Sequence, residues 1–168
     1  MIRPETVLDT WKTTRADAAQ AVEDLPDGDL AFRPLPELMT FGEIARHILG
    51  AGHALSGMLL EGVENFQVPE FREMVKKRDF PLPEDAGASE LAAAMRQSVD
   101  QRTAELSRQS PEFFAKIVTK WDGAKLTRLE LIQFLKEHEL GHRAQLFTYL
   151  RFKGVTPVTT RRRQSKQA

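Results

Sequence analysis

Cysteine is absent from the 168-residue sequence. Its absence excludes disulfide bonds, metal sites built on thiolates and a cysteine nucleophile, and it is compatible with a reducing cytoplasm. Long apolar runs are also missing, and none approaches the roughly 20 residues that a membrane-spanning helix needs. The first ten residues carry two acidic side chains and no apolar segment, unlike a signal peptide. We therefore expect a cytoplasmic protein without a membrane partner.

A net charge of one sign is missing as well, because 24 lysines and arginines balance 24 aspartates and glutamates. Such a balance gives no general attraction to nucleic acid or to acidic membranes, and we expect no nucleic-acid partner. A hydrophobic fraction of 41% and a charged fraction of 29% are typical of a globular protein, and the length suits one domain. We expect that domain to cover residues 1–157. Basic residues are concentrated in the polar segment 158–168, which we expect to be a disordered tail.

Apolar residues recur at the spacing of amphipathic helices in four long segments. These segments cover approximately residues 5–25, 40–60, 89–108 and 127–153. Thr40 and Glu43 match the T-x-x-E capping box that begins a helix, and Thr127 and Glu130 match it again. Ser89 is the expected N-cap of the third helix. An all-α four-helix bundle is the simplest fold for these segments.

The connection over residues 61–88 is unusually long for a compact bundle. It permits a crossover between the second and third helices, and residues 70–77 within it predict a short helix. Four large apolar side chains of this connection could form a lid over a pocket: Phe66, Phe71, Met74 and Phe80. Further along, residues 117–118 precede an Asp-Gly pair, which predicts a brief extended segment and a turn. Gly62 and Gly154 are expected to end the second and fourth helices.

Three of the four histidines are positioned to share a metal ion. His138 and His142 are one helical turn apart, so that their rings project side by side from the apolar stripe of the fourth helix. An unpaired imidazole on that stripe is costly, but this pair alone suits a structural role as well as a metal site. His47 lies on the apolar stripe of the second helix, and bundles build metal sites from side chains on facing helices. We predict that His47, His138 and His142 hold one divalent transition-metal ion, with zinc, nickel, iron and manganese as candidates.

Polar residues near these histidines admit more than one role. Gln145 lies one turn after the third of them, and it is either a cofactor-binding or substrate-binding side chain or a helix-surface glutamine. Glu43 has a sufficient role in its capping box, although it could also orient a ligand. His53 points roughly 120° away from the metal-binding face and is predicted to lie at a surface or interface, and Glu139 is predicted to be solvated. Arg143 could contact an anionic substrate or form an interface. The sequence assigns no catalytic residue.

Two stretches resemble the metal-binding segments of the DinB/YfiT-like family. The first is TFGEIARHI at residues 40–48, and the second is EHELGHRAQL at residues 137–146, followed by YLR at 149–151 and by Gly154. The resemblance implies a four-helix bundle, usually a homodimer, in which three histidines hold a divalent metal ion. Carried over to this sequence, those ligands are His47, His138 and His142. Gly141 stands where many relatives have a further histidine, which leaves the three ligands intact.

Members of this family with assigned activities include transferases and isomerases that use low-molecular-weight thiols, and others are presumed metal-dependent hydrolases. The resemblance therefore implies an enzyme whose metal activates a thiol cofactor or a water molecule against a small-molecule substrate. Three protein ligands leave coordination positions open, as catalytic zinc sites do. The alternative is a non-enzymatic, stress-related bundle that captures a metal or a small ligand with closed coordination. A bundle without metal would need hydrogen-bond partners for both histidines of the fourth helix within its apolar stripe.

Overall fold

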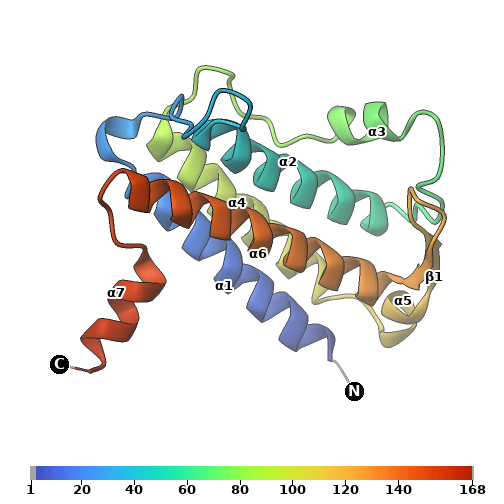
Figure 1. The fold of residues 1–168 in the computed structure, drawn as a ribbon. Coiled ribbons are helices and arrows are strands. Elements are labelled where there is room, and N and C mark those ends of the chain that lie inside the picture. The colour runs from blue at the N-terminus through green and yellow to red at the C-terminus, as the bar shows by residue number, and fades with distance from the viewer. Residues whose placement is uncertain (1–2, 168) are drawn as a thin grey trace.

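The computed structural model describes residues 3–167, and long helices make up most of it (Figure 1). The four long helices are α1 (Pro4–Glu23), α2 (Phe41–Leu60), α4 (Ala88–Leu106) and α6 (Arg128–Phe152). The shorter elements are η1 (Pro26–Gly28), α3 (Phe71–Lys77), α5 (Pro111–Ala115), β1 (Ile117–Thr119), β2 (Lys125–Thr127) and α7 (Val158–Ser165). The predicted all-α four-helix bundle is confirmed. Within residues 3–167, none of the helices combines the length and the apolar character that a membrane span requires.

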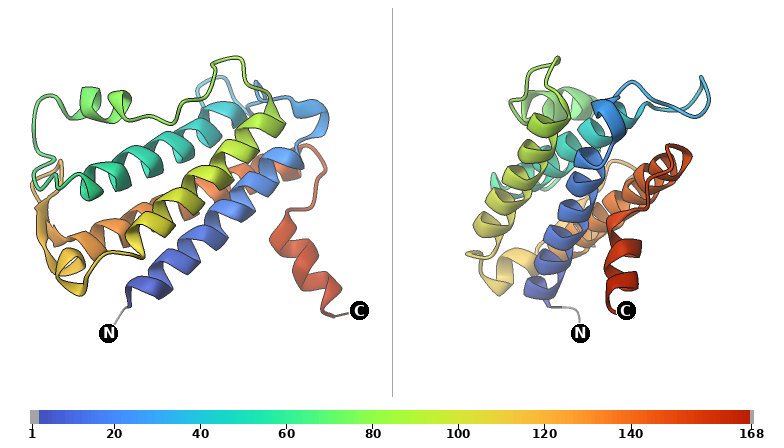
Figure 2. Two further views of the ribbon diagram at one scale, coloured as in Figure 1. Left: turned by 180° about the vertical axis from the view of Figure 1, so that it is seen from behind. Right: turned by 90° about the vertical axis from the view of Figure 1, so that its left-hand side faces the viewer.

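The four long helices pack in the order α1, α4, α2, α6 around the bundle, because α1 and α2 each contact both α4 and α6. Figures 1 and 2 show that the neighbours α2 and α4 run in the same direction, and so do the neighbours α1 and α6. Because α2 and α4 are consecutive long helices that run parallel, the chain between them must return along the whole bundle. Residues 61–87 provide it and carry α3, as the predicted crossover requires.

Both predicted capping boxes are formed. At the start of α2, Thr40 Oγ1 accepts a hydrogen bond of 3.1 Å from the Glu43 N–H, and the Glu43 carboxylate accepts one of 2.6 Å from the Thr40 N–H. The same pair of bonds begins α6. The N-cap of α4 differs from the prediction, because it is Gly87, whose N–H donates to the Glu90 carboxylate at 3.0 Å. Ser89 therefore lies in the first turn of that helix.

The predicted helix ends and the predicted turn are also present. Gly62 follows α2 with a φ of 86° and Gly154 follows α6 with a φ of 75°, a left-handed conformation that glycine adopts without steric cost. The short strands β1 and β2 pair antiparallel, and Gly123 in the turn between them has a φ of 87°. This hairpin lies at the end of the bundle where α6 begins (Figure 1).

An ion pair lies inside the bundle between two clusters of buried apolar side chains. The first cluster includes Ala18, Ile48, Met95 and Leu146, and the second includes Trp11, Leu55, Val99 and Leu135. Arg15 of α1 and Glu139 of α6 lie between them, with side chains only 0% and 1% exposed. The prediction that Glu139 is solvated is wrong, because Arg15 reaches it from the neighbouring helix.

His53 was predicted to lie at a surface or interface, and a surface position is wrong, because the side chain is buried between α2 and α4. Its Nδ1 lies 3.0 Å from the Ser98 hydroxyl, and its Nε2 lies 2.9 Å from the Arg102 guanidinium. Both partners belong to α4. His53 and His47 lie on different faces of α2, as helical periodicity predicts. The face that carries His53 is covered by α4.

The expected disordered tail is wrong for residues 158–165, which form α7. Arg162 of α7 lies 2.7 Å from the carboxylate of Asp17 on α1, and Arg143 of α6 lies 3.2 Å from the same carboxylate. Asp17 is buried, so these two cations balance a charge that is largely removed from water. Arg161 of α7 lies 2.7 Å from the carboxylate of Asp24, so two basic residues of the segment have acidic partners on the bundle. Residue 168 lies outside the described residues.

Candidate metal centre

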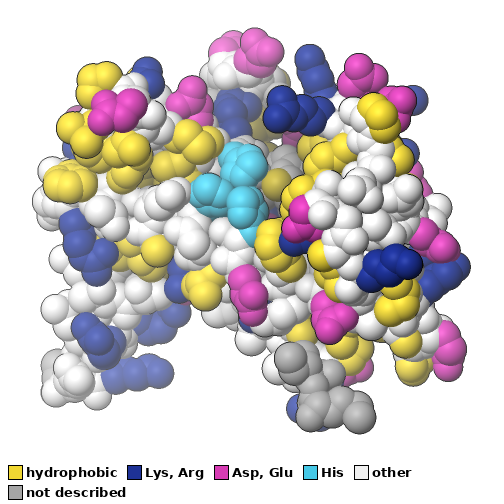
Figure 3. Space-filling model, turned by 45° about the vertical axis from the view of Figure 1, so that its right-hand side comes forward, with side chains coloured by type: hydrophobic (Ala, Val, Ile, Leu, Met, Phe, Trp, Pro, Cys, Tyr) yellow, Lys and Arg dark blue, Asp and Glu magenta, His cyan; other side chains and the backbone are white. Residues whose placement is uncertain are grey.

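The three histidines that the sequence singles out lie together in the groove between α2 and α6. His47 comes from α2, and His138 and His142 come from successive turns of α6. One ring nitrogen of each lies within 4.8 Å of the others, and Nε2 of His47 is 2.9 Å from Nε2 of His138. Figure 3 shows histidine side chains gathered at the surface, with hydrophobic side chains on both sides of them.

The cluster lies at the rim of the bundle and not in its core. His47 is exposed, and His138 and His142 are half-buried. Helical periodicity predicts both imidazoles of α6 on the apolar stripe, but the innermost positions of that helix belong to residues such as Leu135 and Glu139. The difference arises because the apolar stripe of α6 is broad, and its border faces the groove toward α2. A ligand can therefore reach the histidines from solvent.

The surroundings of His47 and His138 favour the neutral form of these two imidazoles near pH 7. Partial burial, together with the positive charges that His142 and His47 would carry, lowers the pKa of His138 to about 4. Burial, followed by repulsion from His142, also lowers the pKa of His47 below its ordinary value. A neutral imidazole retains the nitrogen lone pair that a metal ion needs.

These donors fit a divalent transition metal. Imidazole suits zinc, nickel, iron and copper, and the cluster consists of histidines alone. Nitrogens that each lie about 2.0–2.1 Å from a tetrahedral zinc ion are roughly 3.3 Å apart. The 2.9 Å between the nitrogens of His47 and His138 is close to that spacing. Glu43 does not join the cluster, because its carboxylate is engaged in the capping box, whose hydrogen bonds lower its pKa.

Gln145 contacts one of the candidate ligands. Its side-chain oxygen lies 2.7 Å from Nδ1 of His142. A carbonyl oxygen can only accept, so Nδ1 carries the proton and Nε2 keeps the lone pair for a metal. The structure thus gives Gln145 a role in orienting His142, and direct contact with a cofactor stays a prediction.

Replacing Gln145 with leucine is expected to weaken metal binding by about 10–100-fold, because His142 loses the partner that fixes its tautomer and ring orientation. Competition with a chromophoric chelator measures this affinity. The matched control is Gln101→Leu, which changes an exposed glutamine of α4 and should leave the affinity unchanged. An unaltered affinity in Gln145→Leu would show that the hydrogen bond does not position the ligand.

An apolar pocket of about 210 Å³ adjoins the histidines. Its lining consists of His47, Ala51, Leu55, Phe71, Val75, Trp121, Phe134, Leu135 and His138. Of the four side chains expected to form a lid, only Phe71 lines this pocket. Phe66 is fully buried in the core, and the Phe80 ring packs edge-on against His53.

Trp121 lines the pocket although no sequence pattern predicts it there. It lies in the turn of the hairpin, and its ring stacks on Phe71 with 5.2 Å between the ring centroids. No spacing relates it to the histidines, so only the fold brings it to the pocket. Phe134, by contrast, precedes His138 by one turn, and that interval was visible in the sequence.

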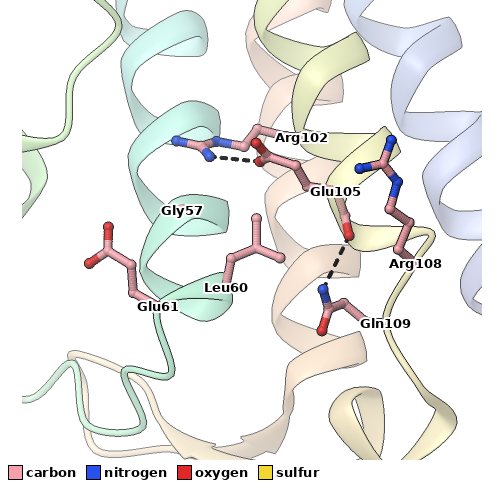
Figure 4. Close-up of a pocket in the computed structure, with 7 residues that line it drawn as sticks. All are labelled: Gly57, Leu60, Glu61, Arg102, Glu105, Arg108 and Gln109. Carbon is pink, nitrogen blue, oxygen red and sulfur yellow. Dashed lines mark hydrogen bonds and ion pairs between the residues drawn. The ribbon is translucent and has the colours of Figure 1, made fainter.

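A second hollow, of about 390 Å³, lies between α2 and α4 on another face of the bundle (Figure 4). It is lined by Gly57, Leu60, Glu61, Arg102, Glu105, Arg108 and Gln109. Its charged groups largely pair with each other or with neighbours: Arg102 lies 2.8 Å from Glu105, and Glu61 lies 2.7 Å from Arg78. None of the three clustered histidines belongs to its lining, so we do not assign the chemistry to it.

Known proteins resemble this chain in sequence and in fold. YjoA of Bacillus subtilis (strain 168), an uncharacterized protein, is 22% identical over 158 residues, which cover 94% of this chain and 96% of YjoA. The crystal structure of YjoA, described as a DinB-like protein, matches with a TM-score of 0.68 and 21% identity over 90% of this chain and 94% of that one. YfiT from Bacillus subtilis is described as a probable metal-dependent hydrolase with an unusual four-helix bundle topology. It matches with a TM-score of 0.69 and 14% identity over 93% of this chain and 92% of that one.

The family assignment rests on a match along the whole chain. The model of the DinB family covers residues 1–168. The match includes both histidine segments, and it agrees with the resemblance seen in the sequence. This protein therefore belongs to the DinB family.

Proposed function

We propose that this protein is a metal-dependent enzyme of the hydrolase type, which holds one divalent transition-metal ion on His47, His138 and His142. The observation that carries the proposal is the convergence of three imidazole nitrogens within 4.8 Å at a solvent-accessible rim. A bound divalent ion supplies a water molecule of lowered pKa, which can act as a nucleophile near neutral pH. A substrate would reach the ion from solvent or from the adjacent pocket, whose lining includes His47 and His138.

Two observations favour water over a thiol as the activated group. YfiT, which shares the fold, is described as a probable metal-dependent hydrolase. In addition, the described lining of the pocket beside the histidines contains no lysine or arginine that could pair with the carboxylates of an amino-acid-derived thiol. Thiol transfer, the alternative that the family resemblance implies, would need the thiol to come from a bound small molecule, because the chain has no cysteine.

The test is whether activity depends on the metal and on the histidines. We expect the zinc- or nickel-loaded protein to hydrolyse members of a panel of activated esters and small amides. A chelator should abolish the activity and one metal equivalent should restore it. His142→Ala should lower kcat/KM by about a hundredfold or more, because a metal ion contributes several kcal/mol to catalysis. His53→Gln, which changes a histidine outside the cluster, should retain most of the activity.

Other outcomes of the same assay discriminate between the remaining functions. Transfer of a low-molecular-weight thiol without hydrolysis would contradict the hydrolase proposal and support a thiol transferase. A tightly bound metal without any activity would support a non-enzymatic metal-binding bundle. We also propose a small-molecule substrate, a homodimer and a cytoplasmic location. The homodimer rests on the family resemblance alone, and the location rests on the sequence alone.

A further inference from the structure

Two residues that line the apolar pocket also belong to the candidate metal centre. His47 and His138 belong both to the histidine cluster and to the pocket lining. A group that occupies the pocket therefore lies next to the place where a metal ion would be bound. The other lining residues come from α2, α3, the hairpin turn and α6, and all of them are apolar: Ala51, Leu55, Phe71, Val75, Trp121, Phe134 and Leu135.

Aromatic rings form a continuous wall from α3 to the histidines. Phe71 and Trp121 stack with an interplanar angle of 22°, and Trp121 contacts Phe134 with 5.6 Å between centroids. Phe134 in turn stacks on His138, with 6.3 Å between centroids and an angle of 10°. Such rings offer faces and edges for the offset and edge-on contacts that a further aromatic ring prefers.

The size of the pocket limits what it can hold. A protein cavity of about 150 Å³ with an apolar lining binds benzene. The 210 Å³ of this pocket therefore accommodates one ring with a short substituent, or a branched aliphatic group of similar volume. A polycyclic group or a peptide segment would extend beyond it.

The lack of charged side chains in the pocket lining favours an uncharged occupant. No lysine, arginine, aspartate or glutamate belongs to its described lining. Lys120, whose Nζ lies 4.8 Å from the centre of the Phe134 ring, is paired at 2.7 Å with Asp122. An ammonium group in the pocket would lose its hydration without gaining a partner, and a carboxylate would find no cationic partner among the lining side chains.

We propose that this pocket binds an uncharged aromatic or branched apolar group of the substrate and holds the adjoining polar bond against the three histidines. The inference rests on the proposed function, since it supplies that site with a substrate class: small esters, amides or related compounds with one apolar arm. Phe71, Trp121 and Phe134 would then be the residues that determine specificity.

The direct test compares two metal-binding probes, acetohydroxamate and benzohydroxamate. They differ only in the substituent on the carbonyl carbon, which is methyl in the first and phenyl in the second. Calorimetry on the zinc-loaded full chain is expected to show at least about tenfold tighter binding of benzohydroxamate, since burial of the phenyl ring removes apolar surface from water. Ala51→Leu fills the pocket from α2, and it should reduce that preference to about twofold while acetohydroxamate binds as before. The matched control is Ala93→Leu, an exposed alanine of α4, which should keep the full preference.

A second variant and a second probe distinguish binding in the pocket from binding at the metal centre. Val75→Phe narrows the pocket from α3, on a helix that carries no histidine of the cluster, and it should also abolish the preference. Benzyl alcohol, which needs no metal, should give a saturation-transfer NMR signal with the metal-free wild type and a much weaker one with Ala51→Leu. If neither hydroxamate binds, the proposed function fails, and benzyl alcohol still decides whether the pocket binds a ring.

Three results would overturn the inference: equal affinities for the two hydroxamates, a preference that Ala51→Leu and Val75→Phe both retain, or no benzyl alcohol signal. A change of oligomeric state in Ala51→Leu, seen by light scattering without a change in ligand affinity, would instead assign the pocket to a second copy of the chain. That outcome would also overturn a substrate role.

Discussion

Glu139→Ala is expected to destabilise the bundle by about 3–5 kcal/mol, because it leaves the Arg15 guanidinium buried without a counter-charge. Arg15 is completely buried, and its Nε donates to the Glu139 carboxylate at 2.8 Å. Nη2 contacts the other carboxylate oxygen and donates to the backbone oxygen of Ile48 at 3.0 Å, and Nη1 donates to that of Met95 at 3.3 Å. One side chain of α1 thus joins α6, α2 and α4.

Thermal and urea unfolding of the metal-free protein measure this loss, which corresponds to a fall in Tm of roughly 10 °C. The matched control is Glu137→Ala, which removes an exposed carboxylate from the same helix and should change the stability by less than about 0.5 kcal/mol. The double variant Arg15→Met with Glu139→Leu should recover most of the loss, since an apolar pair needs no counter-charge. A cost below about 1 kcal/mol for Glu139→Ala would mean that water reaches the pair.

Gly52 shows how closely the bundle is fitted around this ion pair. A Cβ atom at this position would collide with Nη2 of Arg15 and with the Glu139 carboxylate. Glycine within a helix costs about 0.5–1 kcal/mol relative to alanine, and here the cost makes room for the two charged groups. The sequence contains both charges and the glycine, but nothing in their spacing relates residues on three different helices.

The features that the sequence predicts correctly are those set by neighbours along the chain. The capping box of Thr40 with Glu43 spans one helical turn, and so does the pairing of His138 with His142. Hydrophobic periodicity likewise fixes the four helices within a few residues. The addition of His47 to the cluster followed from placing one histidine on a second apolar stripe, a step that requires only that α2 and α6 become neighbours.

The features that the sequence does not predict depend on which helices become neighbours. His53 was expected at a surface or interface and Glu139 in solvent, and each is buried because a second helix covers its side of α2 or α6. Helical periodicity reports the angle between two side chains, but a helix inside a bundle has two covered sides. Trp121 reaches the pocket only through the hairpin, and the order α1, α4, α2, α6 is invisible to a local pattern.

Each single replacement of His47, His138 or His142 by alanine is expected to weaken metal binding by roughly 100–1,000-fold. Binding free energies of structural zinc sites with four ligands are about 10–16 kcal/mol, or roughly 2.5–4 kcal/mol per ligand. Metal analysis of the tag-free wild type should show about one equivalent per chain, and chelator competition should give the affinities. The three variants should resemble each other, because one ion depends on all three side chains.

The stability of the fold provides a second, independent measurement of the same site. A metal ion that binds only the folded chain stabilises it by about 2.7 kcal/mol at a concentration of 100 times Kd. Added zinc should therefore raise the Tm of the wild type and leave that of His138→Ala unchanged. His53→Gln is the matched control, because this histidine lies outside the cluster and should keep both the stoichiometry and the metal-dependent rise in Tm. A wild type that neither contains nor takes up zinc or nickel would make the three histidines a hydrogen-bonded cluster at the rim of the bundle, and the proposed chemistry would have no metal on which to act.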